Sequence, residues 1–427
     1  MDDSLVRSNR PSRTSWGLVM MNLAALGGIQ NWAPLAEAGL PSLSFLLLGI
    51  LFFFLPVSLV SSELATTWPG GIYEWVGRAF GHRVGFFSIW LLWVQNLLYY
   101  PMMLSFIVGT ISFVFWPDLM EDKVYIYLSI LSIFWAVTFA NLKGFDTSKW
   151  ISVIGAICGT FIPGIFIVGL GSLWWCSDPL SHKSLSFADF IPKLNPNHLP
   201  SFIGSIFALV GIEMSAIHAS PTENPRRGYA RAIFFSALFV VLFSLLGVLS
   251  IALVIPKSEI LLNTAALQAF EYFTQIYSME LFLPFIALVM TIGSIGSMST
   301  WMVGPCMGLV SAAKGKDLPF FLRKIDQNGK PKSFLLLQAL IVSVISLFFL
   351  FSSSMNSFFW FCLILSTQFY LLMYVILFAS AIKLRYTHPE VHRPFKLPGK
   401  MAGMWIVALL GGGTSLIAIL SSFFLKL

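Results

Sequence analysis

The sequence predicts an all-α integral membrane protein in which two five-span repeats of opposite orientation are followed by an eleventh span. Three observations carry this prediction. Of 427 residues, 57% are hydrophobic and only 11% are charged, whereas a soluble domain has about 25% charged residues. Apolar runs long enough to cross a bilayer, about 20 residues each, follow one another along the chain. Two similar glycine-containing interruptions fall in the first and the sixth of these runs.

Eleven spans are expected, and no soluble domain remains between them. They lie at 16–35, 41–63, 84–115, 124–141, 150–175, from 201 onward, 232–255, 281–312, 333–351, 356–382 and 404–425. The expected organisation is a cytoplasmic tail (1–14), a first repeat with an external loop (15–199), a second, inverted repeat (200–383), and a basic cytoplasmic loop with span 11 (384–427). A twelfth span is expected to be absent or missing from this chain.

Lysine and arginine gather on one side of the predicted membrane. Of 26 such residues, all but five lie in the tail and in alternate loops, the exceptions being Lys123, Lys183, Lys193, Lys257 and Lys426. Cytoplasmic segments of membrane proteins are enriched in these residues, so the pattern predicts a cytoplasmic N-terminus. The net charge of +7 is therefore explained by the lipid bilayer as partner, and it does not indicate a nucleic-acid partner.

The sequence contains no pattern for catalysis or for a cofactor. The four cysteines are scattered without CxxC spacing, and no cluster of histidine, cysteine and aspartate has the spacing of metal ligands. No nucleophile stands in a recognisable arrangement with a base. We therefore expect no metal, no cofactor and no enzymatic activity.

The two interruptions, residues 25–33 and 208–216, are identical at five of nine positions. Each brings glycine and a polar side chain to the middle of the membrane, where unwound backbone is tolerated only if it lines a cavity. Because five spans separate them, the two units enter the membrane from opposite sides. Substrates of such inverted repeats bind at mid-membrane between two discontinuous helices. We therefore expect spans 1 and 6 to be broken and to share a site.

The expected chemistry follows from the broken helix ends. A half-helix that begins at a break presents free N–H groups and a partial positive charge, which suit a carboxylate. The unwound carbonyl groups of the other half suit an ammonium group. The pair is complementary to the backbone of an α-amino acid. The expected substrate-binding residues are Gly27, Gly28, Ile29, Gln30, Gly211, Ile212, Glu213 and Ser215.

Two ionisable residues are candidate proton sites. Glu213 lies within the second interruption, and carboxylates inside membranes are costly and usually functional. It is expected to bind substrate or a proton, and the alternative is a structural carboxylate that caps helix ends. His218 follows it and is either a proton sensor or an ordinary helix histidine. Glu37 and Glu63 stand at span ends, where interfacial or capping roles are expected.

Five aromatic residues in spans 3, 8 and 10 are candidates for gating or selectivity. Their alternative role is to pack in the core or face lipid, because aromatic residues make up 15% of the chain. They are Tyr99, Tyr100, Trp301, Tyr370 and Tyr374.

Four motifs carry a resemblance to a known family. Residues 210–218 followed by Glu223-Asn224-Pro225 resemble span 6 of the glutamate/γ-aminobutyrate antiporters, of the amino acid–polyamine–organocation superfamily. Residues 63–76, 299–305 and 393–399 are similar to that family's span 2 exit, its span 8 and the superfamily's loop before span 11. The resemblance implies a LeuT-type fold and amino-acid exchange across a bacterial inner membrane. The expected partner is an amino acid or its decarboxylated amine, and a monomer or homodimer is expected.

Exchange has two alternatives at this stage. The first is proton-coupled uptake by the same fold, with Glu213 or His218 titrating. Some proton-coupled relatives carry a lysine in span 5, where this sequence has Val153 and no charged residue, which favours exchange. The second alternative is an amino-acid sensor that does not transport.

Overall fold

The computed structural model describes residues 28–143, 155, 157–177, 187–192, 199–214, 225–313, 317–326 and 330–424. Within these ranges the chain forms helices and no strand. Nine helical stretches in the described part are long and apolar enough to cross a membrane, and they coincide with the expected spans 2 to 5 and 7 to 11. An all-helical, multi-pass membrane protein is therefore confirmed.

The membrane-crossing stretches are α3 (Pro41–Gly49) with the π-helical turn η2 (Ile50–Phe54) and α4 (Leu55–Thr67), α6 (His82–Phe115), α7 (Lys123–Leu142), η4 (Ile157–Phe161) with α9 (Ile162–Ser177), α12 (Pro225–Val254), α14 (Leu283–Ala312), α15 (Lys332–Phe351), α16 (Met355–Thr387) and α17 (Lys400–Ser422). The shorter elements are η1 (Ile29–Asn31), α2 (Ala33–Glu37), α5 (Ile72–Phe80), η3 (Pro117–Leu119), α10 (Phe187–Phe190), α11 (Leu199–Phe207), η7 (Lys257–Glu259), α13 (Ala265–Ile276), η8 (Glu280–Phe282) and η9 (Phe320–Leu322).

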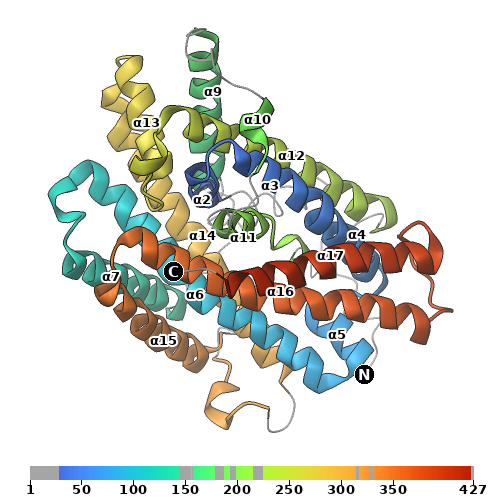
Figure 1. Ribbon diagram of the computed structural model, residues 1–427. Coiled ribbons are helices and arrows are strands. Elements are labelled where there is room, and N and C mark those ends of the chain that lie inside the picture. Colours follow the sequence, from blue (N-terminus) through green and yellow to red (C-terminus); the bar gives the residue numbers. More distant parts are fainter. Residues whose placement is uncertain are drawn as a thin grey trace.

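The long helices α6 and α16 pack against each other along the centre of the molecule (Figure 1). Helix α14 packs on α6, while α7 and α15 pair with each other on the outside of α6. The short helix α11 lies between α2, α3 and α16, and α12 packs on α9, α2 and α4. The two stretches that contain the predicted interruptions are thus brought together beside α6 and α16.

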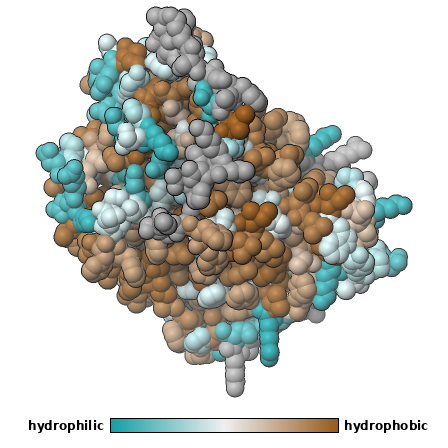
Figure 2. Space-filling model, in the orientation of Figure 1, coloured by the Kyte–Doolittle hydropathy of each residue, from teal (hydrophilic) through white to brown (hydrophobic). Residues whose placement is uncertain are grey.

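The surface agrees with a lipid environment. Figure 2 shows a broad apolar face with hydrophilic residues mainly at its margins. Large apolar side chains are exposed along the outer helices, for example Leu128, Val344, Phe348, Leu409 and Ile417. Contiguous apolar surface of this kind marks a membrane-facing region, because soluble monomers rarely expose large apolar patches.

A buried ion cluster joins the end of α4, the end of α16 and the loop before α17. Arg385 donates through Nε and Nη2 to the two carboxylate oxygens of Glu63, at 2.9 and 2.5 Å. The guanidinium of Arg393 lies 3.2 Å from the same carboxylate, and Leu397 N–H donates to it at 2.8 Å. Burial lowers the pKa of Arg393, while the charge of Glu63 opposes that shift. The expected interfacial position of Glu63 is wrong, because its side chain is only 1% exposed and pairs with arginine inside the protein.

Two glycines allow α14 and η4 to touch backbone to backbone. A Cβ built on Gly293 would lie 2.0 Å from the amide nitrogen of Gly159, and one on Gly159 would lie 2.7 Å from the carbonyl carbon of Gly293. Small residues permit this approach between helices in membranes. Any larger side chain at either position must push the two backbones apart.

Gly293→Ala should therefore destabilise the protein by about 1–3 kcal/mol, the usual cost of overpacking. Gly304→Ala, on the same helix, is the matched control because a Cβ there meets nothing within 4 Å. Thermal melting in detergent should show a lower melting temperature for the first variant and an equal or higher one for the second. Equal melting temperatures for the two variants would contradict the close approach.

Candidate functional site

The chain is not α-helical at the first predicted interruption. Gly28 has an extended backbone (φ −60°, ψ 117°), and Ile29–Asn31 form a 3-10 turn that leads into α2. The backbone hydrogen bonds of this turn run from Asn31 N to Gly28 O and from Trp32 N to Ile29 O. A new helical segment thus starts here, with its first N–H groups free of helical partners. The preceding residues lie outside the described ranges.

The second interruption follows the last residue of α11, Phe207. Gly211 has φ +111°, a conformation that favours glycine, and its N–H donates to the hydroxyl of Tyr374 at 3.0 Å. Residues 212–214 then form a single 3-10 turn. The last carbonyl groups of α11 accept hydrogen bonds from the following turn, in which Leu209 N donates to Ile206 O and Val210 N to Phe207 O. Residues 215–224 lie outside the described ranges.

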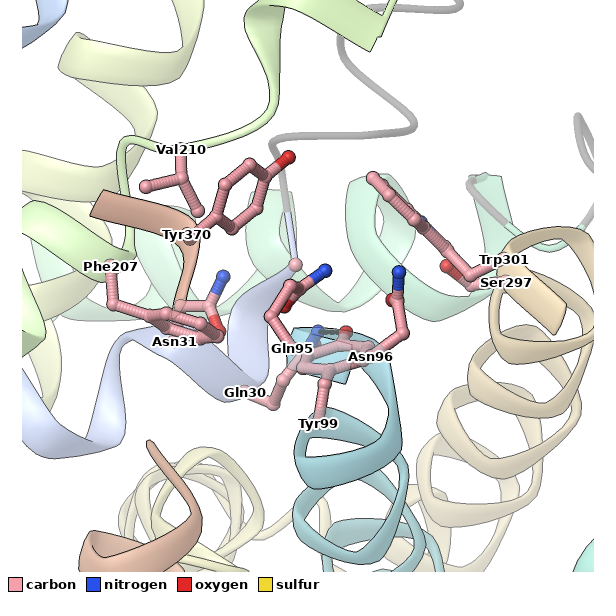
Figure 3. A pocket seen from close by; sticks show the side chains of 11 residues that line it. Gln30, Asn31, Gln95, Asn96, Tyr99, Phe207, Val210, Ser297, Trp301 and Tyr370 are labelled. Atoms are coloured by element: carbon pink, nitrogen blue, oxygen red, sulfur yellow. Dashed lines mark hydrogen bonds between the residues drawn. The ribbon is translucent and has the colours of Figure 1, made fainter. Parts of the chain in front are cut away.

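Both interruptions border one pocket (Figure 3). The space between its lining residues, counted together with its open mouth, is about 510 Å³. It is lined by Gly28, Gln30, Asn31, Gln95, Asn96, Tyr99, Phe207, Val210, Ser297, Trp301 and Tyr370. In Figure 3 the side chains of Gln95 and Asn96 extend from α6 into the space between Tyr370 and Trp301.

Four carboxamides line this pocket, and three of them use one end to bind the protein. Asn96 Nδ2 donates to Leu92 O at 2.9 Å, and no described residue donates to its oxygen. Gln30 Nε2 donates to the hydroxyl of Tyr99 at 3.0 Å, and its oxygen also has no donor among the described residues. Gln95 Oε1 accepts from Ser366 Oγ at 2.9 Å, which leaves its amide nitrogen as a donor.

The fourth carboxamide, Asn31, has a buried Oδ1 with no hydrogen-bond partner among the described residues. A buried acceptor without a partner is costly. A ligand that donates a hydrogen bond in the pocket would satisfy it. The lining thus offers both donors and acceptors to a bound molecule.

Glu213 lies directly behind this pocket and is only 2% exposed. Its Oε1 accepts from the hydroxyl of Tyr370 at 2.8 Å, and its Oε2 accepts from the hydroxyl of Tyr374. The two tyrosine rings, one turn apart on α16, are stacked with centroids 5.3 Å apart. Tyr374 also accepts from Gly211, so α16 holds the second interruption through both its backbone and its carboxylate.

Comparison with known sequences identifies the family of the protein that contains this site. The model of the amino acid permease family matches residues 14–426. The chain belongs to the amino acid permease family. The permease is 37% identical over 402 residues to an uncharacterised transporter of Legionella pneumophila, covering 93% of this chain and 85% of that protein. It is 30% identical over 423 residues to a glutamate/γ-aminobutyrate antiporter of Lactococcus lactis, covering 97% and 84% of the two chains.

A third relative is a probable agmatine/putrescine antiporter of Lactococcus lactis. It is 25% identical over 377 residues, which cover 86% of this permease and 78% of that protein. The three relatives extend across most of both chains. The resemblance to amino-acid antiporters noted in the sequence is therefore confirmed at the level of the family.

In the structure of the permease, the five aromatic candidates fall into two groups. Tyr99, Trp301 and Tyr370 line the pocket. Tyr100 does not line it: its hydroxyl donates to Trp301 O at 2.9 Å, and its ring packs beside Phe134. Tyr374 does not line it either and instead holds Glu213 and Gly211.

The predicted substrate-binding residues also divide. Gly28 and Gln30 line the pocket, while Ile29 and Ile212 are fully buried beside it. Gly211 and Glu213 are held through the two tyrosines of α16 rather than lining it. Three predicted residues lie outside the described ranges, and they are Gly27, Ser215 and His218.

Six lining residues were not among the predicted site residues: Asn31, Gln95, Asn96, Phe207, Val210 and Ser297. A signal for two of them was present in the sequence, because Gln95-Asn96 places adjacent carboxamides in the middle of an apolar run. Polar side chains at membrane depth face a protein interior or a cavity. Phe207, Val210 and Ser297 carried no comparable signal.

Proposed function

We propose that this permease is an amino-acid antiporter that works by alternating access on a LeuT-type fold of two inverted repeats. The observation that carries the proposal is the pocket shared by the two interrupted stretches and flanked by α6, α14 and α16. Substrate sites of inverted-repeat transporters lie between such stretches. The proposed membrane is a bacterial inner membrane, with the N-terminus in the cytoplasm as the charge distribution predicts.

The polar groups of the pocket suit the backbone of an amino acid. Gly28, at the start of η1, lines the same pocket as Val210, which follows α11. Helix starts favour carboxylates and helix ends favour cations. In the proposed pose, the substrate carboxylate lies near Gly28 and the ammonium group near Val210, within reach of the unpartnered Asn31 oxygen.

The rest of the pocket favours a substrate side chain that is polar but uncharged when bound. None of the lining residues in the described part of the chain carries a formal charge. The free donor of Gln95 and the free acceptor of Asn96 together match a carboxamide or a protonated carboxylic acid, each of which donates and accepts. An ionised carboxylate offers acceptors only and would face the Asn96 oxygen.

Exchange is the proposed mode because two of the relatives are named as antiporters, the glutamate/γ-aminobutyrate and the agmatine/putrescine proteins. The second candidate is proton-coupled uptake by the same fold. It is favoured by one observation, the buried carboxylate of Glu213 directly behind the pocket. The two modes differ in what drives uptake.

Counterflow tests the proposal. Proteoliposomes preloaded with unlabelled glutamine, glutamate, lysine or buffer alone are given labelled glutamine without a pH gradient. Exchange predicts uptake that is at least about tenfold faster with internal glutamine than with buffer alone, and little stimulation by lysine. Uptake that ignores the internal amino acid and follows an imposed pH gradient would establish proton coupling instead.

A further inference from the structure

One tryptophan lies where α2, α11 and α16 converge, away from the pocket. Trp360 Nε1 donates to Glu37 Oε2, the last residue of α2, at 2.8 Å. A Cβ built on Gly204 of α11 would lie 3.4 Å from Pro34 Cβ and 3.5 Å from Cη2 of Trp360. Helix α11 therefore faces both α2 and the indole at the same level. The indole lies beside α11, with room for a methyl group at Gly204, and it donates one hydrogen bond to α2.

Along α16, Trp360 precedes the pocket-lining Tyr370 by ten residues, about 15 Å at 1.5 Å per residue. This junction lies at the end of α2 that the charge distribution predicts to be external. The start of α16 is fixed there as well: Asn356 donates to Ile260 O at 3.0 Å and accepts from Leu262 N at 2.9 Å. For a substrate to enter from this end, α2 or α11 must move away from the start of α16, which carries Trp360.

We propose that Trp360 and Glu37 form the gate at the external end of the pocket, and that breaking their hydrogen bond admits the external substrate. The inference rests on the proposed transport function and adds two residues that do not line the pocket. The gate is closed in this structure. The hydrogen bond between Trp360 and Glu37 can break and reform as the gate opens and closes.

The ionisable residues around the gate are few. Elements that pack on α2 include α3, α11, α12 and η7. Among the described residues, α3 and α11 carry no ionisable side chain, nor does α12 beyond Arg231; η7 supplies Lys257 and Glu259, and the first three turns of α16 supply only Cys362. Burial raises the pKa of Glu37, while the hydrogen bond from Trp360 and the charge of Lys257 oppose the shift.

The sign of the pH effect follows from this shift. When the gate opens, water reaches the Glu37 carboxylate and its pKa falls toward the ordinary value. The closed form therefore binds a proton more tightly than the open form, and acid stabilises the closed form. External acidification should make the external substrate bind less well.

Uptake into preloaded cells, which keep one membrane orientation, tests the gate as external pH is lowered from about 7 to about 5 with internal pH clamped. For the wild type, the external KM should rise several-fold. Glu37→Gln, which fixes the neutral form, should give a raised KM that no longer changes with pH. Trp360→Phe, which keeps the ring but removes the donor, should lower KM. Glu259→Gln is the matched control and should keep the wild-type profile.

A wild-type pH profile in Glu37→Gln, or a raised KM in Trp360→Phe with a normal melting temperature, would overturn the gate. A second readout does not depend on transport. In a variant whose native cysteines are replaced, Val210→Cys is labelled from outside with a membrane-impermeant maleimide. Adding Trp360→Phe should speed labelling several-fold, and an unchanged rate would also overturn the gate. Absence of exchange by the wild type, with this labelling effect intact, would reject the proposed function and leave the gate standing.

Discussion

Glu63→Gln should cost the permease about 3–5 kcal/mol of folding free energy, enough to prevent accumulation of folded protein at 37 °C. The substitution preserves the shape of the side chain but removes its charge. Among the described residues, Glu63 is the only acid that forms an ion pair with Arg385 and Arg393, so both guanidinium groups lose their counter-charge. Removing one partner of a buried ion pair leaves an uncompensated charge, which accounts for an effect of this size.

The chain supplies a matched control for that prediction. Glu74 and Arg78 form an exposed pair on α5, 2.5 Å apart, with side chains that are 32% and 46% exposed. Exposed pairs contribute about 0–1 kcal/mol, so Glu74→Gln should leave the melting temperature nearly unchanged. The measurement is thermal melting in detergent together with the yield of monodisperse protein. Similar losses in both variants would show that the buried cluster has no special role.

Glu213→Gln should slow exchange by roughly two orders of magnitude while leaving the protein folded. The buried carboxylate accepts hydrogen bonds from two tyrosine hydroxyls. Hydrogen bonds to a charged group contribute about 1.5–3 kcal/mol each, and each 1.4 kcal/mol is a factor of about ten in rate. The measurement is the initial rate of counterflow in proteoliposomes at saturating and at low substrate concentration.

Two further variants separate the roles of the tyrosines. Tyr370→Phe changes the pocket lining and should mainly raise KM. Tyr374→Phe leaves both Gly211 N–H and a carboxylate oxygen without their partner, so it should lower the maximal rate and the melting temperature together. Glu271→Gln on α13 is the control and should exchange at the wild-type rate. Normal exchange by Glu213→Gln would contradict any role of this carboxylate in transport.

Much of the fold could be predicted because membrane spans are a local property of the sequence. Nine helical stretches coincide with the expected spans, since a run of about 20 apolar residues must cross the bilayer as a helix whatever its neighbours are. Glycine marked the same positions that are non-helical in the structure, Gly28 and Gly211. The positive φ of Gly211 is allowed by the absence of a Cβ, which is also a local property.

The sequence could not determine which face of each helix meets the pocket. Tyr99 and Tyr100 are adjacent and chemically identical, yet Tyr99 lines the pocket and Tyr100 binds Trp301 O on another face. Successive residues on a helix point about 100° apart, so the rotation of α6 decides between them. That rotation is set by packing against α14 and α16, partners that lie far away in the sequence.

The sequence by itself thus determined the membrane class, the positions of the described spans and the two non-helical glycines. Tertiary structure alone decided that Glu63 is buried between two arginines, that four carboxamides from two segments share one pocket, and that Trp360 reaches Glu37. The physical reason is the separation along the chain over which each interaction acts. Hydrophobicity and backbone freedom act within one helix, whereas ion pairs, pockets and gates require side chains from helices up to about 320 residues apart to meet.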